Sequence, residues 1–234
     1  MFGRRGFRSL LRRHRKKALR FEAPAQLHSL FMASVAYSES PDELLALLES
    51  SGGQRDPRKS QGELFPSFYD SGPKLRELLS ALVSRYRPRV IMETGVAHGG
   101  STQVFLDSLD LLSQEAGESG SVLHSVDVEP RTKDVIREGH PRWRWHHLRE
   151  DNSLEKIFRT VGPIDVFFHD SDHSYRNQMV EYELAWKYLN PGGFLISDDI
   201  SWSNAFQDFC RKVEVRPLIL SESPKVAGFI RKSF

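Results

Sequence analysis

The sequence is poor in the features that mark secreted and membrane proteins. It contains a single cysteine, Cys210, among 234 residues. One cysteine cannot form an internal disulfide, and it cannot build a zinc site from cysteine ligands. No run of 18 apolar residues occurs, and the N-terminal region lacks the apolar segment of a secretory signal. From these absences we predict a cytoplasmic protein without a transmembrane segment.

Acidic residues are missing from the first 20 positions, which hold nine lysine and arginine residues. The rest of the chain has 24 basic residues against 31 acidic ones, so its net charge is negative. A basic arm can contact RNA, an anionic lipid surface or an acidic partner, and an Arg-rich start also resembles an organellar transit peptide. A solvated, mobile tail is the simpler interpretation. We predict such an arm over residues 1–22, and a mildly acidic body that carries no strong nucleic-acid signal.

Residues 23–73 are predicted to form an extension of helix and loop. Ser40–Glu43 has the form of a capping box, and residues 51–73 are rich in glycine, serine, proline and charge. Phe65, Phe68 and Tyr69 are unusual in a mere linker. A lid or substrate wall is one interpretation of this loop, and packing onto the core is the other.

From residue 74 onward, strand and helix patterns alternate. Strands are expected at 90–92, 122–126, 143–148, 164–169 and 194–197, with helices at about 74–86, 101–112, 131–138, 152–160, 174–189 and 203–212. Repeated strand–helix units predict a parallel sheet with helices on both faces. The last two strands, at about 213–220 and 226–232, have only a Ser-Glu-Ser-Pro turn between them, which predicts an antiparallel hairpin. We therefore predict one α/β domain over 74–234, with a seven-stranded, mostly parallel sheet.

The stretch Val90–Thr102, VIMETGVAHGGST, predicts a cradle for a nucleotide cofactor. A buried strand ends at the acidic residue Glu93, and glycines follow at 95, 99 and 100. Glycine lets the backbone turn sharply and approach a ligand closely. Ser101 or Thr102 is expected to cap the next helix. The dinucleotide fingerprint G-x-G-x-x-G fails because alanine stands where its second glycine belongs.

Acidic residues also follow the second and third expected strands. Asp127 comes 34 residues after Glu93 and can accept hydrogen bonds from two ribose hydroxyls, with Glu129 as the alternative acceptor. Asp151 follows the third strand, where it either lies beside the cofactor or caps a helix.

Two acidic clusters end neighbouring strands of the expected sheet. Asp170, Asp172 and His173 form the first cluster, and Asp198 and Asp199 follow 28 residues after Asp170. Because adjacent parallel strands lie about 4.8 Å apart, carboxylates at their ends can converge on one cation. Oxygen ligands suit Mg²⁺, which binds them at about 2.1 Å. The alternative is that Asp170 and Asp198 cap the helices that follow.

Taken in order, these motifs resemble class I methyltransferases, which use S-adenosyl-L-methionine (SAM). The E-x-G-x-x-x-G loop, the acid after the second strand, the Pro-Gly-Gly at 191–193 and the closing hairpin carry the resemblance over residues 74–232. It implies a Rossmann-like fold and a SAM site. Its expected residues are Glu93, Gly95, Gly99, Ser101, Asp127, Asp151 and Asp170.

The two acidic clusters resemble those of metal-dependent O-methyltransferases of the catechol type and of the bacterial sugar and antibiotic-tailoring type. That resemblance implies a Mg²⁺ site formed by Asp170, Asp198 and Asp199. The catechol enzymes usually end the second cluster in Asp-Asn, whereas this chain has Asp-Asp. A broader methyltransferase family shares the Asp-x-Asp-His-Ser-Tyr motif, and metal dependence does not follow from that motif.

We therefore predict a SAM-dependent methyltransferase that methylates a hydroxyl of a small molecule or sugar with the help of Mg²⁺. Asp172 and His173 are the candidate bases for removing the hydroxyl proton. One alternative is an RNA or protein methyltransferase that docks through the basic arm. The other is a non-catalytic SAM-binding protein. A homo-oligomer is compatible with the sequence, which carries no signature of a particular acceptor.

Overall fold

The computed structural model describes residues 70–116, 120–136, 140–222 and 225–233. The predicted basic arm (1–22) and nearly all of the predicted extension (23–73) lie outside these residues, so neither prediction is tested here. Among the described residues, no helix is long and apolar enough to cross a membrane.

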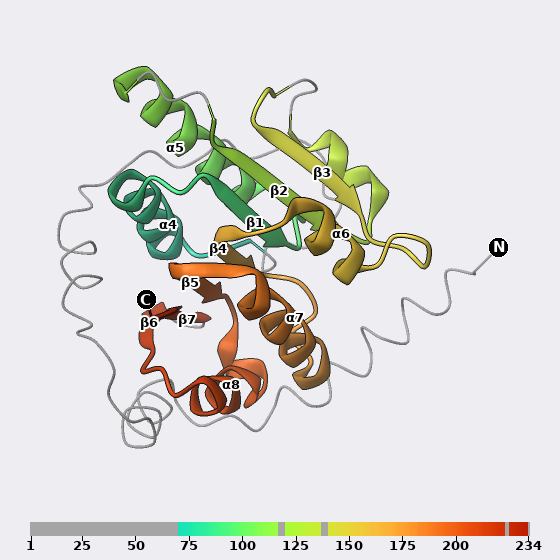
Figure 1. Cartoon of the computed structure of the whole chain (residues 1–234), viewed down its shortest axis with the longest axis vertical. Helices are drawn as coiled ribbons and strands as arrows, with labels where there is room; N and C mark the ends of the chain where they lie inside the picture. The colour runs from blue at the N-terminus through green and yellow to red at the C-terminus, as the bar shows by residue number, and fades with distance from the viewer. Residues whose placement is uncertain (1–69, 117–119, 137–139, 223–224, 234) are drawn as a thin grey trace.

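Seven strands form one sheet in the order β3-β2-β1-β4-β5-β7-β6 (Figure 1). The strands are β1 (Val90–Thr94), β2 (Val122–Asp127), β3 (Trp143–His147), β4 (Ile164–His169), β5 (Leu189–Ser197), β6 (Leu218–Glu222) and β7 (Lys225–Arg231). Neighbouring strands from β3 to β5 pair in parallel, and β7 runs antiparallel to both β5 and β6. The predicted seven-stranded sheet with a C-terminal antiparallel hairpin is confirmed.

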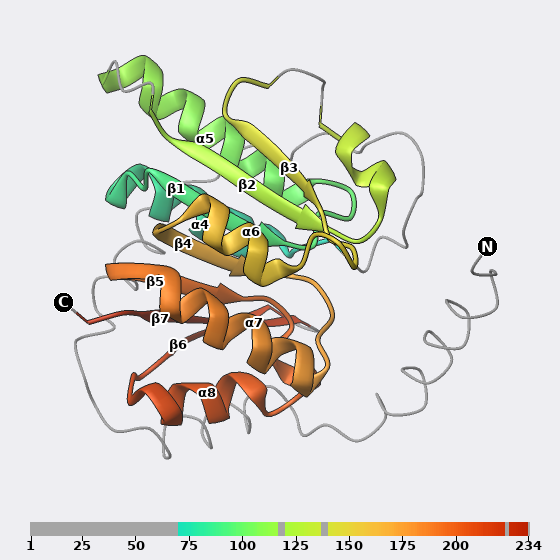
Figure 2. The ribbon, with the colours of Figure 1, turned by 45° about the vertical axis from the view of Figure 1, so that its right-hand side comes forward.

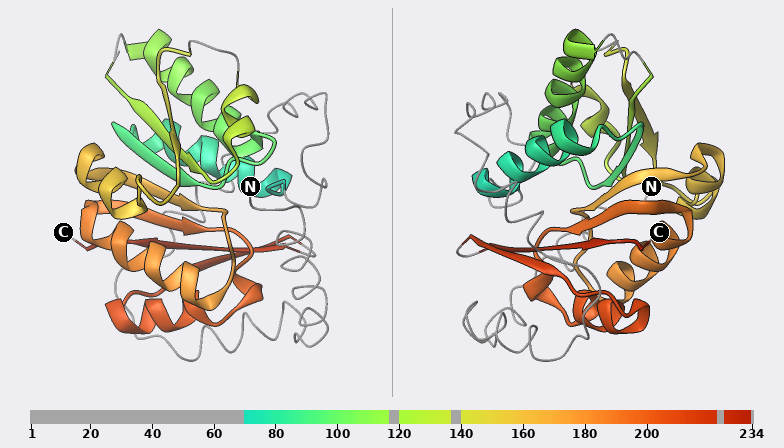
Figure 3. Two further views of the ribbon diagram at one scale, coloured as in Figure 1. Left: turned by 90° about the vertical axis from the view of Figure 1, so that its right-hand side faces the viewer. Right: turned by 60° about the vertical axis from the view of Figure 1, so that its left-hand side comes forward.

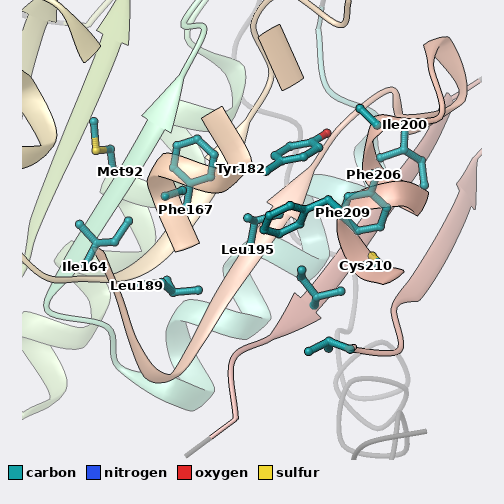
Figure 4. Close-up of a cluster of buried hydrophobic side chains, with 14 of the residues drawn as sticks. Met92, Ile164, Phe167, Tyr182, Leu189, Leu195, Ile200, Phe206, Phe209 and Cys210 are labelled. Carbon is teal, nitrogen blue, oxygen red and sulfur yellow. The ribbon is translucent and has the colours of Figure 1, made fainter. Parts of the chain in front are cut away.

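Helices cover both faces of this sheet (Figures 2 and 3). They are α4 (Pro73–Tyr86), α5 (Gly100–Ala116), α6 (Leu154–Val161), α7 (Tyr175–Tyr188) and α8 (Ala205–Val213), with short 3-10 helices η2 (Pro130–Asp134) and η3 (Ile200–Trp202). Side chains alternate along each strand. Ile91 and Phe168 therefore pack with α4 and α5, while Met92 and Phe167 pack with α6, α7 and α8 (Figure 4).

The prediction of a helix at about 131–138 was wrong. The described residues there form only the short 3-10 helix η2, whose N-cap Glu129 accepts a hydrogen bond from the Arg131 amide. The Pro-Gly-Gly turn expected before the fifth strand also differs, since it lies inside β5. The pairing of β4 with β5 shifts register there, passing from Ile164–Leu189 to Val166–Phe194, so the turn residues are accommodated as an irregularity within the strand.

The reversed direction of β7 decides which residues reach the functional edge of the sheet. The parallel strands β1, β2, β4 and β5 end at one edge, with Thr94, Asp127, His169 and Ser197. Ser197, at the end of β5, is paired with Gly228, early in β7. The first residue of β7, Lys225, therefore starts at the edge where the parallel strands finish.

Candidate active site

The glycine loop after β1 needs glycine for two physical reasons. Gly95 has φ +85°, and a Cβ added there would lie 2.0 Å from the carbonyl oxygen of Asp170. Gly99 has φ +78°, and its added Cβ would meet the Val135 side chain at 2.9 Å. A residue with a side chain would be costly at either position, because the backbone φ is positive and because its Cβ would approach a neighbouring residue too closely. The loop that the sequence predicts as a cradle is thus held directly against the end of β4.

Glu93, near the end of β1, holds the start of this loop in place through buried hydrogen bonds. Its side chain is fully buried and accepts hydrogen bonds from the hydroxyls of Ser101, Thr102 and Ser125. Burial raises the pKa of Glu93 to about 7, although the three hydroxyls oppose the shift. The carboxyl group therefore joins the end of β1 to the first turn of α5 and to β2. Direct contact of Glu93 or Ser101 with SAM stays a prediction.

The expected capping role of Ser101 or Thr102 is wrong. Helix α5 already begins at Gly100, so both hydroxyl groups lie inside its first turn. They donate to Glu93 and leave the orphan amides of the helix start to other partners.

Asp127 lies at the end of β2 and faces the glycine loop. Its two carboxylate oxygens accept hydrogen bonds from the Val96 amide and the Glu129 amide, each at 2.8 Å. Glu129, the alternative acceptor, forms an ion pair with Arg131 at 2.7 Å. These contacts orient Asp127 beside the loop and favour it over Glu129 as the acceptor for the ribose hydroxyls.

Asp151 is exposed, with a side chain 71% accessible and an ion pair to Arg149 at 2.6 Å. The alternative that it caps a helix is wrong, because Ser153 is the N-cap of α6 and accepts from the Lys156 amide. Its predicted contact with the cofactor stays a prediction.

The three acidic residues expected to bind a metal do meet at the edge of the sheet. Asp170 follows β4, and its amide donates to the Thr94 carbonyl; Asp198 follows β5, and its amide donates to the His169 carbonyl. Burial raises the pKa of Asp170 and that of Asp198 to about 7 each, and neighbouring carboxylates add to both shifts. Neither aspartate caps a following helix, because Ser174 is the N-cap of α7 and Asp199 precedes η3.

Lys225, which the sequence analysis missed, supplies the positive charge among these acids. Its Nζ lies 3.2 Å from Asp198 Oδ2 and 3.4 Å from Asp199 Oδ2. Burial lowers the pKa of this lysine, but the carboxylates of Asp198, Asp199 and Asp170 outweigh burial and raise it. The predicted hairpin was the sequence signal that could have identified Lys225, because a reversed last strand begins at the edge of the sheet where the parallel strands end.

The predicted Mg²⁺ site does not fit this arrangement. Among the described residues, no group of three or more histidine, cysteine, aspartate or glutamate side chains is placed to hold a metal ion. The ammonium group of Lys225 contacts two of the three expected ligands, and a divalent cation bound to the same oxygens would be repelled by it.

The structure separates the two candidate bases. His173 lies with the acids, its Nε2 3.6 Å from Asp170 Oδ1 and 3.8 Å from Asp199 Oδ2, and its side chain is 13% accessible. Burial lowers the pKa of His173, which keeps the imidazole neutral near pH 7. Asp172 is exposed, and its carboxylate accepts from the amide and hydroxyl of Ser174. Of the two candidate bases, only His173 therefore lies at the cluster, and the action of either residue as the base stays a prediction.

A buried polar network supports the floor of the site. His169 is fully buried, and its Nδ1 lies 2.8 Å from Glu181 Oε2. Glu181 also accepts from the hydroxyls of Thr94 and Ser171. This network ties α7 to the ends of β1 and β4, and sequence reasoning did not find Glu181 because its partners are far away in the chain.

Comparisons with known proteins agree with this fold. Residues 92–200 match the family model of a methyltransferase domain, a range that runs from β1 to the second acidic cluster. An uncharacterized protein of Acanthamoeba polyphaga mimivirus is 34% identical over 77 residues, which are 31% of this chain and 32% of the length of that relative.

Solved structures of methyltransferases share the architecture. The O-methyltransferase from Bacillus cereus, in complex with S-adenosylhomocysteine (SAH), is 17% identical and aligns over 87% of this chain and 96% of its own, with a TM-score of 0.58. TomG from Streptomyces achromogenes, an O-methyltransferase involved in tomaymycin synthesis and solved with SAM, is 13% identical over 85% of this chain and 92% of its own, with a TM-score of 0.57. The methyltransferase PaMTH1 of Podospora anserina, bound to SAH, is 13% identical over 90% of this chain and 95% of its own, with a TM-score of 0.54.

The strand order, the closing hairpin and the glycine loop after β1 are those of the Rossmann-like fold that class I methyltransferases share. The match of residues 92–200 to a methyltransferase-domain model lies within this fold and includes the glycine loop and both acidic clusters.

Proposed function

We propose that this protein transfers the methyl group of SAM to a hydroxyl group of a small molecule or sugar. The carrying observation is the position of His173, a mostly buried imidazole whose Nε2 lies 3.6 Å from Asp170, the residue whose backbone packs against Gly95 of the glycine loop. Two of the similar solved proteins are O-methyltransferases by name, which supports an oxygen acceptor.

The chemistry of the reaction explains why a base is needed here. The methyl group of SAM is electrophilic because it is bound to a positively charged sulfur, but a hydroxyl is a weak nucleophile near pH 7. In the proposed step the oxygen–methyl bond forms, the sulfur–methyl bond breaks, and the hydroxyl proton passes to His173. The carboxylates of Asp170 and Asp199 then stabilise the imidazolium ion that results.

Trp202 is the candidate wall of the acceptor pocket. Its side chain is 41% exposed, and its ring centroid lies 6.3 Å from that of His173 at an interplanar angle of 32°. An exposed indole beside the base offers a flat apolar surface on which an aromatic ring or a sugar can lie. This position supports a cyclic acceptor that bears a hydroxyl group.

The direct test is methyl transfer from isotope-labelled SAM to a panel of catechols, other phenols and sugars by the full-length protein. We expect a methyl ether as the product for at least one hydroxyl acceptor. Labelling of RNA or of protein in place of every hydroxyl acceptor would overturn the proposal and support docking through the basic arm. Binding of SAM without turnover on any acceptor would support the non-catalytic alternative.

The proposal includes no metal step, because two of the three residues expected to bind Mg²⁺ already form ion pairs with a lysine. It assigns SAM contact to the glycine loop, Asp127 and Asp151, and proton removal to His173.

A further inference from the structure

Lys225 reaches the acidic cluster from β7, which is antiparallel to both of its neighbouring strands. It is the first residue of β7 and pairs with Glu222 at the hairpin. Its side chain is 16% accessible, and Asp198, its nearer partner, is 1% accessible. A lysine this enclosed needs fixed partners for its charge, and the two aspartates provide them.

The ammonium group of Lys225 has one N–H donor more than the two that its carboxylate partners accept. Lysine Nζ carries three N–H donors. Within the described residues, Asp198 and Asp199 accept two of them. His173 approaches the same Asp199 oxygen, at 3.8 Å, so the third donor and the candidate base belong to one small cluster.

We propose that Lys225 takes the place of the divalent cation and donates its third N–H to the acceptor oxygen. This inference rests on the proposed O-methyl transfer. Negative charge grows on the acceptor oxygen as His173 removes its proton, and a fixed ammonium group stabilises that charge. The proton on Nζ stays in place throughout, so Lys225 positions the acceptor and stabilises charge while His173 carries the proton.

The first experiment measures metal binding and needs no acceptor. Mn²⁺ is titrated into the full-length protein, and free Mn²⁺ is followed by electron paramagnetic resonance. We expect no saturable site in the wild type and one saturable site in Lys225→Met, which leaves the carboxylates without their cation. Adding Asp198→Asn to Lys225→Met should abolish that site. The control Lys212→Met removes a lysine from an exposed ion pair with Glu183 and should behave as the wild type.

The second experiment measures methyl transfer to an acceptor from the panel, in excess EDTA. We expect wild-type activity to survive chelation and Lys225→Met to lose about a hundredfold to a thousandfold in kcat/KM, as loss of one charge-stabilising donor typically does. Mg²⁺ added in excess over the EDTA should restore part of the loss in Lys225→Met only. Lys225→Arg, which keeps the charge, should retain more activity than Lys225→Met.

Saturable Mn²⁺ binding by the wild type that requires Asp170 and Asp198 would overturn the inference. Wild-type kcat/KM of Lys225→Met in EDTA would overturn it as well. The wild-type titration and the chelation assay decide the question even where thermal unfolding shows that Lys225→Met does not fold. If no hydroxyl acceptor is methylated, the proposed function fails, while the Mn²⁺ titrations still decide whether Lys225 occupies the cation position.

Discussion

Single carboxyl groups at the strand ends differ in what surrounds them. Glu93 is enclosed by three neutral hydroxyl groups, whereas Asp198 faces the ammonium group of Lys225. A hydroxyl group stabilises a buried carboxylate less than a cation does, because it carries only a partial charge. Glu93 is thus suited to hold the loop in shape, and Asp198 to hold a charged partner.

At this scale, the burial of Glu93 predicts a pH dependence of stability. Its pKa is about 7 in the folded protein against the ordinary value of 4.5, so the native state keeps a proton that the unfolded chain releases. The contribution of protonated Glu93 to the free energy of unfolding is fully present below pH 4.5, declines as the pH rises, and is lost above about pH 7. It amounts to about 3 kcal/mol in the free energy of unfolding.

Urea unfolding of the wild type and of Glu93→Gln across this pH range measures the effect. The free energy of unfolding should fall less steeply with pH in Glu93→Gln than in the wild type. Glu155→Gln, from an exposed ion pair with Arg159, serves as the control and should keep the wild-type slope. Equal slopes for all three proteins would contradict the assignment.

The positions of His173 and Asp172 predict opposite results for two neighbouring substitutions. His173→Asn removes the base, so kcat should fall by about 100-fold or more while SAM affinity stays unchanged. Asp172→Asn alters only the turn before α7, so kcat should remain close to the wild-type value. Steady-state kinetics and calorimetric titration with SAM check both expectations. A larger loss in Asp172→Asn than in His173→Asn would reverse the roles.

Among the elements, the loop between β1 and α5 depends on a close contact with the end of β4. Gly95 is packed against the backbone of Asp170, and its amide donates to the Val126 carbonyl at 2.9 Å. One loop therefore touches Asp170, which follows β4 and lies near the proposed base, and the strand β2, which ends in Asp127. This contact is how the cofactor cradle and the acceptor site are held in one geometry.

Gly95→Ala should break that arrangement. The new Cβ would collide with the Asp170 carbonyl oxygen. The backbone φ of +85° at this position adds a conformational cost of about 1 kcal/mol for alanine. We expect the Kd for SAM to rise by about tenfold or more, measured by calorimetric titration. Gly120→Ala is the matched control, because an added Cβ there meets nothing within 4 Å. An unchanged Kd in Gly95→Ala would show that the loop does not form the cradle.

For the whole molecule, charge is distributed unevenly along the chain. The first 20 residues hold nine of the 33 lysine and arginine residues and none of the 31 acidic residues. The acidic body carries the methyltransferase fold, and the site residues that the structure describes belong to it. Acceptor methylation is therefore expected to need only the body when the acceptor is a small molecule.

Removal of residues 1–20 tests this expectation. The kcat/KM for a hydroxyl acceptor should stay at the full-length value at both low and high salt, because a small acceptor is expected to bind among the residues of the body. An RNA acceptor would instead lose affinity steeply at low salt, and its salt dependence would flatten. Steady-state kinetics over a salt series distinguishes the two.

The sequence by itself determined the α/β alternation, the reversed last strand and the positions of the loop and acidic clusters. Those features depend on local periodicity and on glycines and carboxylates that lie close together in the chain. It left Asp172 and His173 equivalent, and it did not link Lys225 to Asp198, 27 residues earlier. Only the tertiary structure decided that His173 faces the acids, that Glu93 is enclosed, and that a lysine stands where Mg²⁺ was expected. The physical reason is that side-chain surroundings depend on which strands meet at an edge, and strand pairing is a long-range property of the fold.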